Sequence, residues 1–234
     1  MFNFSFDKRI LYVVLGIMVV STLIQYTTQE GALLSLLLTI PGVLIAITFH
    51  EYAHAFAADK LGDDTPRRQG RLSLNPFAHL DPIGCVLLLF AGFGWGKPVE
   101  VNPRNYNRNI SMEKADAIVS FAGPAMNFVL AIIFTLIYCA IYKFASTAFL
   151  LSTYGMVILS LISYTIAINI GLGVFNLIPL PPLDGSKIIN IFLPYNNEII
   201  NENWLICLLA AELITVFTCR YSRNGGRIYG TENV

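Results

Sequence analysis

Residues 32 to 54 read ALLSLLLTIPGVLIAITFHEYAH, an apolar run that carries no charged residue until it ends in the pattern H-E-x-x-H. On a helix, His50 and His54 lie one turn apart and project from the same face. Two imidazoles so placed can take two of the four tetrahedral positions around Zn²⁺. Glu51 lies on the adjoining face, where it can accept a proton from a metal-activated water without being a ligand. The pattern predicts a metal site; the alternative is a pair of hydrogen-bonded histidines.

The composition indicates an integral membrane protein. Of the 234 residues, 55% are hydrophobic and 13% are charged, whereas about 25% of a typical soluble domain is charged. The formal net charge is zero, so neither a nucleic acid nor an acidic partner is indicated. The four cysteines contain no C-x-x-C pair, which indicates small apolar residues rather than a disulfide framework or a thiolate zinc site. Ionisable groups within such a membrane segment are costly, so His50, Glu51 and His54 are functional candidates.

The apolar segments predict an all-α polytopic membrane protein with about five to six transmembrane helices. A helix of about 20 residues crosses the hydrocarbon core of a bilayer. The expected spans are residues 10–29, 32–60, 117–142 and 150–174, followed by a last apolar segment at 204–219. Glu212 interrupts that last segment, and the prolines between Phe175 and Gly185 must break the fourth helix. Residues 186–193 are expected to form a short helix.

Residues 85–101 are predicted to form a re-entrant β-hairpin, or membrane-dipping sheet, between the second and third spans. The stretch 85–95 is apolar and rich in glycine, but it is too short to cross a bilayer as a helix. Together with the following Val99-Glu100-Val101, it favours a pair of strands. Non-helical backbone is tolerated at membrane depth only where protein or water satisfies its polar groups.

The chain is predicted to be one transmembrane domain, residues 1–219, with a polar tail, residues 220–234, that we expect to be disordered. No polar block is long enough for a separate soluble module. The positively charged loops 60–71 and 97–114 should face the cytoplasm, as should the N-terminus. This orientation places the two histidines near the cytoplasmic end of the second helix. The arginines of the tail conflict with a simple odd number of spans.

A catalytic zinc with two histidine ligands needs one more protein ligand. Asp184 is slightly favoured, because it stands in an uncharged, proline-rich break beside a span. The alternative is an ordinary Leu-Asp-Gly turn, in which aspartate and glycine are common. His79, in a polar connector between prolines, is the other candidate. A structural or gating role suits His79 better, because a fourth protein ligand would close the site.

Four motifs follow one another along the chain in a recognisable order. They are His50-Glu51-Tyr52-Ala53-His54, Asn75-Pro76 through His79 to Gly84, Gly123-Pro124-Ala125-Met126-Asn127, and Asn176 through Pro179 to Asp184-Gly185. Together they resemble the site-2 protease family of intramembrane zinc metalloproteases, in a short form without a PDZ or CBS module. The resemblance implies that His50, His54 and Asp184 bind one Zn²⁺ per chain and that Glu51 is the general base. It also implies that Asn127 helps to hold the substrate or the oxyanion.

On the residues alone, Asn127 suits a hydrogen bond between helices equally well. By the resemblance, the single domain is a metalloprotease that cleaves transmembrane segments of membrane proteins near the cytoplasmic side, in the cell membrane of a prokaryote. The edge of the hairpin would pair with an unwound substrate strand. The expected partners are thus a transmembrane protein substrate and the lipid bilayer. Two other functions stay open: an ion or metal transporter, and a non-catalytic relative that binds membrane proteins, against which the intact Glu51 argues.

Overall fold

The computed structural model describes residues 16, 17, 20, 21, 24, 27, 28, 31–81, 84, 96–189 and 191. The named elements within these residues are all helices, and three of them are long and apolar enough to cross a membrane. The elements are α2 (Ala32–Lys60), α3 (Thr65–Arg68), η1 (Pro76–Ala78), η2 (Pro103–Asn105), α5 (Met112–Phe144), α6 (Thr147–Leu150), α7 (Thr153–Asn176) and α8 (Asp184–Ile189). A mostly helical fold with three candidate membrane spans is therefore confirmed.

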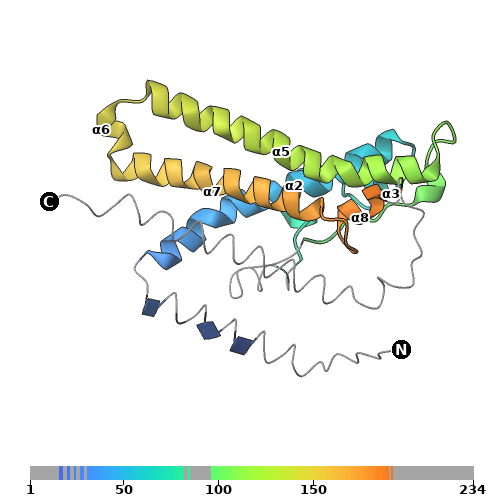
Figure 1. Cartoon of the computed structure of the whole chain (residues 1–234), viewed down its shortest axis with the longest axis horizontal. Coiled ribbons are helices and arrows are strands. Elements are labelled where there is room, and N and C mark those ends of the chain that lie inside the picture. The colour runs from blue at the N-terminus through green and yellow to red at the C-terminus, as the bar shows by residue number, and fades with distance from the viewer. Residues whose placement is uncertain are drawn as a thin grey trace.

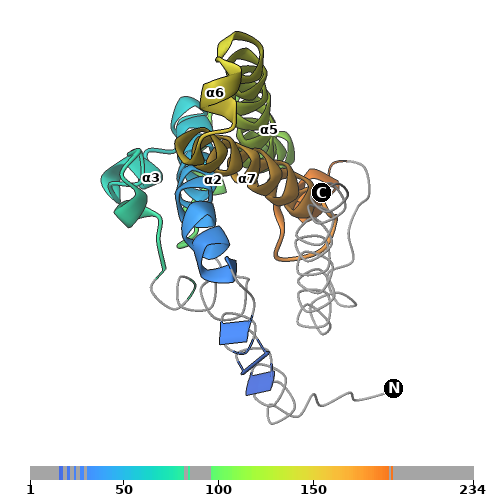
Figure 2. The ribbon, with the colours of Figure 1, turned by 90° about the vertical axis from the view of Figure 1, so that its left-hand side faces the viewer.

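The three long helices, α2, α5 and α7, each pack against the other two (Figures 1 and 2). The short helix α6 joins α5 to α7 at one end of the molecule, and α3 and α8 lie at the opposite end (Figure 1). Only 22%, 17% and 22% of the apolar windows of α2, α5 and α7 are buried inside the protein. Most of their apolar side chains therefore face outward, as suits helices surrounded by lipid.

Small residues form much of the contact between the long helices. An added Cβ at Gly42 of α2 would lie 3.0 Å from the Cα of Thr165 in α7, so these two backbones pass close together. The hydrophobic effect does not drive helices together in lipid. Because Gly42 has no side chain, the two backbones can instead make direct van der Waals contact. The buried alanines are Ala32, Ala46, Ala53, Ala55, Ala58, Ala115, Ala117 and Ala131.

The helix bounds differ modestly from those expected from the apolar runs. Helix α5 begins at Met112, before the apolar run at 117–142, because the charged residues Glu113 and Lys114 are good helix formers that extend the helix into the polar loop. Helix α7 begins at Thr153, where the Ser152 hydroxyl caps it by accepting a hydrogen bond from the Gly155 backbone N–H at 3.1 Å. Helix α2 continues through Pro41 without interruption.

Several predicted segments lie wholly or largely outside the described residues. They are the first span at 10–29, the hairpin residues 85–95, the last apolar segment at 204–219 with Glu212, and the tail at 220–234. The described part of the predicted hairpin contributes one antiparallel bridge, between Leu80 and Gly96. No strand occurs among the residues that the structure describes.

A buried carboxylate ties together the polar loops at the α3 end of the molecule. Asp63 accepts hydrogen bonds from the backbone N–H and hydroxyl of Thr65, from the Asn102 backbone N–H at 2.6 Å and from the Asn105 side chain at 2.9 Å. Burial acts to raise the pKa of the Asp63 carboxyl, but these hydrogen bonds hold it below its ordinary value. The turn after α2 is thereby fixed to the segment that runs from residue 96 to η2.

Candidate active site

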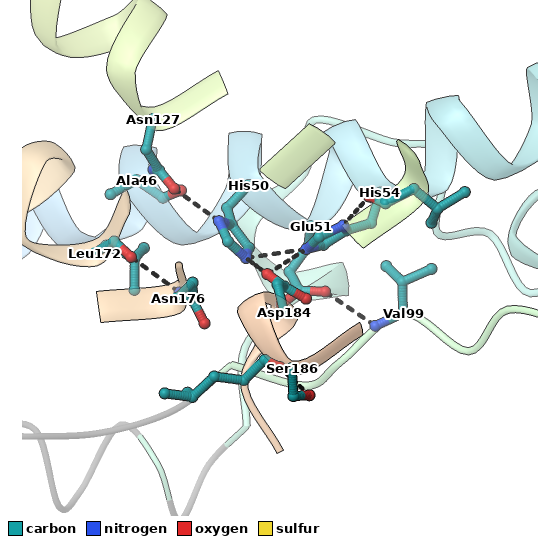
Figure 3. Close-up of polar contacts among 12 residues, drawn as sticks. Ala46, His50, Glu51, His54, Val99, Asn127, Leu172, Asn176, Asp184 and Ser186 are labelled. Atoms are coloured by element: carbon teal, nitrogen blue, oxygen red, sulfur yellow. Dashed lines mark hydrogen bonds and ion pairs between the residues drawn. The ribbon is translucent and has the colours of Figure 1, made fainter. Parts of the chain in front are cut away.

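Two histidine rings meet on the buried side of α2. His50 and His54 are separated by one helical turn, and their rings stand edge to face with centroids 4.6 Å apart. Both side chains are buried, and their Nε2 atoms lie 3.0 Å from each other. The helical spacing that the sequence predicted therefore brings two ligand-type nitrogens together (Figure 3).

The opposite nitrogens of the two rings bond to carbonyl oxygens of α5. His50 Nδ1 lies 2.7 Å from the side-chain Oδ1 of Asn127, and His54 Nδ1 lies 2.7 Å from the backbone oxygen of Val119. A carbonyl oxygen can only accept, so each Nδ1 must carry the hydrogen. Each neutral ring therefore directs the lone pair of its Nε2 toward the other ring.

A carboxylate oxygen joins the two nitrogens. Asp184, the first residue of α8, places its Oδ2 3.3 Å from His50 Nε2 and 3.2 Å from His54 Nε2. This Oδ2 is buried and has no hydrogen-bond partner among the described residues. His50, His54 and Asp184 form the group of metal-ligating side chains, within the described part of the chain, that could hold one ion.

The three converging atoms fit a cation. With both Nδ1 hydrogens engaged by α5, two nitrogen lone pairs and a carboxylate oxygen face one another within 3.0 to 3.3 Å. Such an arrangement is repulsive unless a metal cation, or in its absence a proton, lies between the atoms. Two imidazoles and one carboxylate, with a fourth position left for water or substrate, are a ligand set of catalytic zinc sites.

Gly123 lets α5 approach the histidine pair. A Cβ at this position would lie 2.4 Å from His54 Nε2 and 2.7 Å from His50 Cε1, both far inside van der Waals contact. Gly123, the first residue of the stretch Gly123-Pro124-Ala125-Met126-Asn127, must therefore be glycine, because the two imidazole rings occupy the space of a side chain.

We expect Gly123→Ala to displace the imidazoles and to lower zinc affinity at least about ten-fold. Gly171→Ala is the matched control, since a Cβ added there, in α7, meets no atom of the described residues within 4 Å. The measurement is chelator competition for zinc on both purified variants. Equal zinc affinity of the two variants would contradict the close approach of α5.

The turn before α8 explains why glycine follows Asp184. A Cβ at Gly185 would lie 2.3 Å from the backbone oxygen of Leu177 and 2.5 Å from that of Ile178. The chain therefore folds back on the end of α7 so tightly that only glycine fits. This fold brings a carboxylate from beyond the last turn of α7 to the histidines on α2.

Glu51 projects beside the ligand group (Figure 3). Its Oε2 accepts a hydrogen bond from the backbone N–H of Val99 at 2.9 Å. The extended segment after Gly96 therefore holds the carboxylate that the sequence analysis selected as a general base. No sequence pattern links Val99 to Glu51, which lies 48 residues earlier.

Asn127 is fully buried, and its polar atoms are engaged among the helices. Its Oδ1 faces His50 Nδ1, while its Nδ2 donates to the Ala46 oxygen at 3.1 Å and to Asn169 Oδ1 at 3.0 Å. In this geometry the side-chain amide of Asn127 forms hydrogen bonds between helices, which is the role that the residues alone indicated as equally suitable. A contact with substrate or oxyanion would require some of these hydrogen bonds to break.

His79 lies apart from the metal-ligating group. Its ring is fully buried, its Nε2 bonds the Ser73 oxygen at 2.7 Å, and its backbone oxygen accepts from the Lys97 N–H at 2.7 Å. These contacts attach the connector to the segment that leads to Val99. They suit the structural role considered for His79 rather than the ligand role.

Two asparagines of α7 were missed by the sequence analysis as site residues. Asn176, the last residue of α7, donates one N–H to the Leu172 oxygen at 3.0 Å (Figure 3). Asn169 is fully buried against Asn127. Both are amides in an otherwise apolar span, a signal that could have identified them.

The fold and the site indicate the class of protein: a membrane protein with a candidate metal centre. Its long helices are able to span a membrane, and two histidines and an aspartate converge among its helices. Comparison with known proteins specifies the family. The sequence model of peptidase family M50 matches residues 151–218, which include α7 and Asp184. "Putative zinc metalloprotease YwhC" of Bacillus subtilis is 41% identical over 152 residues, which are 65% of this chain and 67% of that protein. The chain belongs to peptidase family M50.

More distant relatives have the same kind of name. "Putative zinc metalloprotease Rip2" of Mycolicibacterium smegmatis is 33% identical over 152 residues, or 64% of this chain, and that of Mycobacterium tuberculosis is 30% identical over 63% of this chain. The matched region spans 54% of each Rip2 protein. No solved structure matches the chain significantly.

Proposed function

We propose that this chain is a zinc-dependent peptidase that hydrolyses peptide bonds in the transmembrane segments of membrane proteins. The observation that carries the proposal is the convergence of His50 Nε2, His54 Nε2 and Asp184 Oδ2 within 3.3 Å, with Glu51 beside them. The family and the names of YwhC and Rip2 support zinc, one ion per chain, as the cofactor and peptide hydrolysis as the reaction.

Each residue of the site has a separate task in this proposal. His50, His54 and Asp184 hold the metal and leave one coordination position for the reactants. Zinc supplies Lewis acidity, which lowers the pKa of water and polarises a carbonyl group. Glu51 accepts the proton of the attacking water and later donates it to the leaving amine, so that no net proton is lost. Asn127 keeps the His50 ring in place.

The substrate must reach the site in an extended form. A carbonyl within a helix is already hydrogen-bonded and is shielded by side chains, so the scissile segment has to unwind first. In our proposal, residues 85–101 form a re-entrant hairpin whose edge pairs with the unwound segment. Because the Val99 N–H is bonded to Glu51, the substrate strand would pair with the backbone N–H and C=O groups of the residues next to Val99.

The arrangement in the membrane completes the proposal. Residues 1–219 form one domain with five to six spans, and residues 220–234 form a polar tail. The positive charge of loops 60–71 and 97–114 supports a cytoplasmic position for them in the cell membrane of a prokaryote. The active site then lies toward the cytoplasm, because His54 is close to the Lys60 end of α2.

Removing the Val99 N–H should impair catalysis but not zinc binding. An ester in place of the amide at Val99 deletes the donor to Glu51 and leaves all side chains unchanged. We expect turnover to fall roughly ten- to hundred-fold, because the base loses its orientation. Zinc content should stay at one equivalent. An ester at Val101 is the matched control; equal turnover of the two esters would remove the Val99 contact from the mechanism.

The test of the proposed function is reversible loss of the metal. The purified chain should be placed in liposomes together with a single-span membrane protein from the same organism. It should cleave that protein to a shorter product. Dialysis against a chelator should stop product formation, and one equivalent of Zn²⁺ should restore it. Zinc transport across the liposome without any peptide product would instead favour the transporter, and tight substrate binding without cleavage would favour the non-catalytic relative.

A further inference from the structure

A second amide lies behind the histidine site, in α7. Asn169 is fully buried within a membrane-length apolar helix, where an unsatisfied amide would be costly. Its Nδ2 donates to the backbone oxygen of Thr165 at 2.8 Å, one turn earlier in the same helix. Its Oδ1 accepts from Asn127 Nδ2 at 3.0 Å.

The Thr165 oxygen determines which way the Asn169 amide faces. A backbone carbonyl can only accept, so the NH₂ group of Asn169 must point to it and the Oδ1 must point to Asn127. Asn127 is thereby offered an acceptor and turns its own NH₂ group toward α7. The orientation of the Asn169 amide therefore determines the orientation of the Asn127 amide.

The Ala46 oxygen on α2 reinforces the same orientation of Asn127. This backbone acceptor takes a hydrogen bond from Asn127 Nδ2 at 3.1 Å, so both N–H groups of the amide are used. Only Oδ1 remains, and it lies 2.7 Å from His50 Nδ1. With the hydrogen on Nδ1, the lone pair of His50 Nε2 faces His54 and Asp184.

We propose that Asn169 is a positioning residue for the metal centre, which acts through Asn127 to fix the tautomer and ring orientation of His50. The inference rests on the proposed function for the identity of the metal. It assigns α7 a role in the site beyond carrying the chain to Asp184. Residues that orient a metal-binding histidine are worth about ten- to hundred-fold in metal affinity.

The test compares two variants of α7. Asn169→Leu keeps a similar size but removes the acceptor for Asn127. Thr165→Val is the matched control. It removes a buried hydroxyl that, among the described residues, bonds only the Leu161 oxygen of its own helix, and it leaves the Thr165 backbone carbonyl in place. Both variants should lower the unfolding temperature of the metal-free protein. Only Asn169→Leu should lower zinc affinity, by about ten- to hundred-fold in chelator competition.

A double mutant tests whether Asn169 acts through Asn127. Asn127→Leu should weaken zinc binding on its own, and adding Asn169→Leu should weaken it little further, because the path is already broken. Additive losses, or a zinc affinity of Asn169→Leu equal to that of Thr165→Val, would overturn the inference. A wild-type chain that binds no zinc at His50 would instead overturn the proposed function.

A measurement on the wild-type protein keeps the inference testable even if the variants do not fold. Nitrogen-15 NMR of labelled histidine in the metal-free wild-type protein should report the hydrogen of His50 on Nδ1. The opposite tautomer would overturn the proposed orientation. If Asn169→Leu folds, a mixture of both His50 tautomers should appear in it, while Thr165→Val should retain the single form.

Discussion

Glu51→Gln should abolish peptide cleavage while leaving one zinc bound. Glutamine keeps the size of the side chain and can still accept the Val99 N–H through its carbonyl oxygen, which lies 2.9 Å away in the wild type. It cannot accept a proton from water. We expect turnover to fall by roughly 10²- to 10⁴-fold, the usual contribution of general acid–base catalysis.

Metal analysis and cleavage of a membrane substrate should be measured on the same preparation of this variant. Glu100→Gln is a suitable control, because it removes an exposed carboxylate from the same extended segment, where Glu100 bonds only Gln69 among the described residues. Substantial cleavage by Glu51→Gln would eliminate the general base. Zinc loss in that variant would move Glu51 into the ligand set.

Asp184→Asn should lose both zinc and cleavage. The amide is nearly isosteric, but it replaces the negative charge that faces two nitrogen lone pairs at 3.2 and 3.3 Å. A neutral third ligand binds Zn²⁺ much more weakly than a carboxylate, so we expect zinc content well below one equivalent after dialysis, and no product. The measurement is zinc per chain beside cleavage of the same membrane substrate.

His79→Gln tests the other ligand candidate in the same assay. Glutamine can still donate to the Ser73 oxygen, the contact that His79 Nε2 makes at 2.7 Å. Zinc content should therefore stay at one equivalent. Retained zinc in Asp184→Asn together with lost zinc in His79→Gln would reverse the assignment of the third ligand.

The long helices, and the three side chains that converge as candidate ligands, could be predicted because their signals are local. An uncharged run predicts a span, the spacing of His50 and His54 predicts a shared helix face, and a carboxylate in a proline-rich break is conspicuous at membrane depth. The bounds of α5 were shorter in the prediction, because the apolar run ends where the lipid-facing part ends, whereas the helix continues into charged residues.

The contacts behind the ligands could not be predicted, because they depend on which helices become neighbours. The hydrogen bond of Glu51 to Val99, and the path from Asn169 through Asn127 to His50, each join residues more than 40 positions apart. A buried asparagine in a span indicates a polar partner, but the sequence does not say which helix supplies it. Asn127 illustrates this: the resemblance assigned it to the substrate or the oxyanion, which stays a prediction, whereas its amide in this structure bonds His50, Ala46 and Asn169.

X-ray absorption at the zinc edge of the purified, zinc-loaded chain tests the central claim most directly. A centre formed by His50, His54 and Asp184 predicts two imidazole nitrogens at about 2.0–2.1 Å, and carboxylate and solvent oxygens at about 2.0–2.2 Å. The imidazole signal should halve in His50→Ala if any zinc remains bound. A sulfur scatterer at about 2.3 Å, or fewer than two imidazoles in the wild-type protein, would contradict the proposed metal centre.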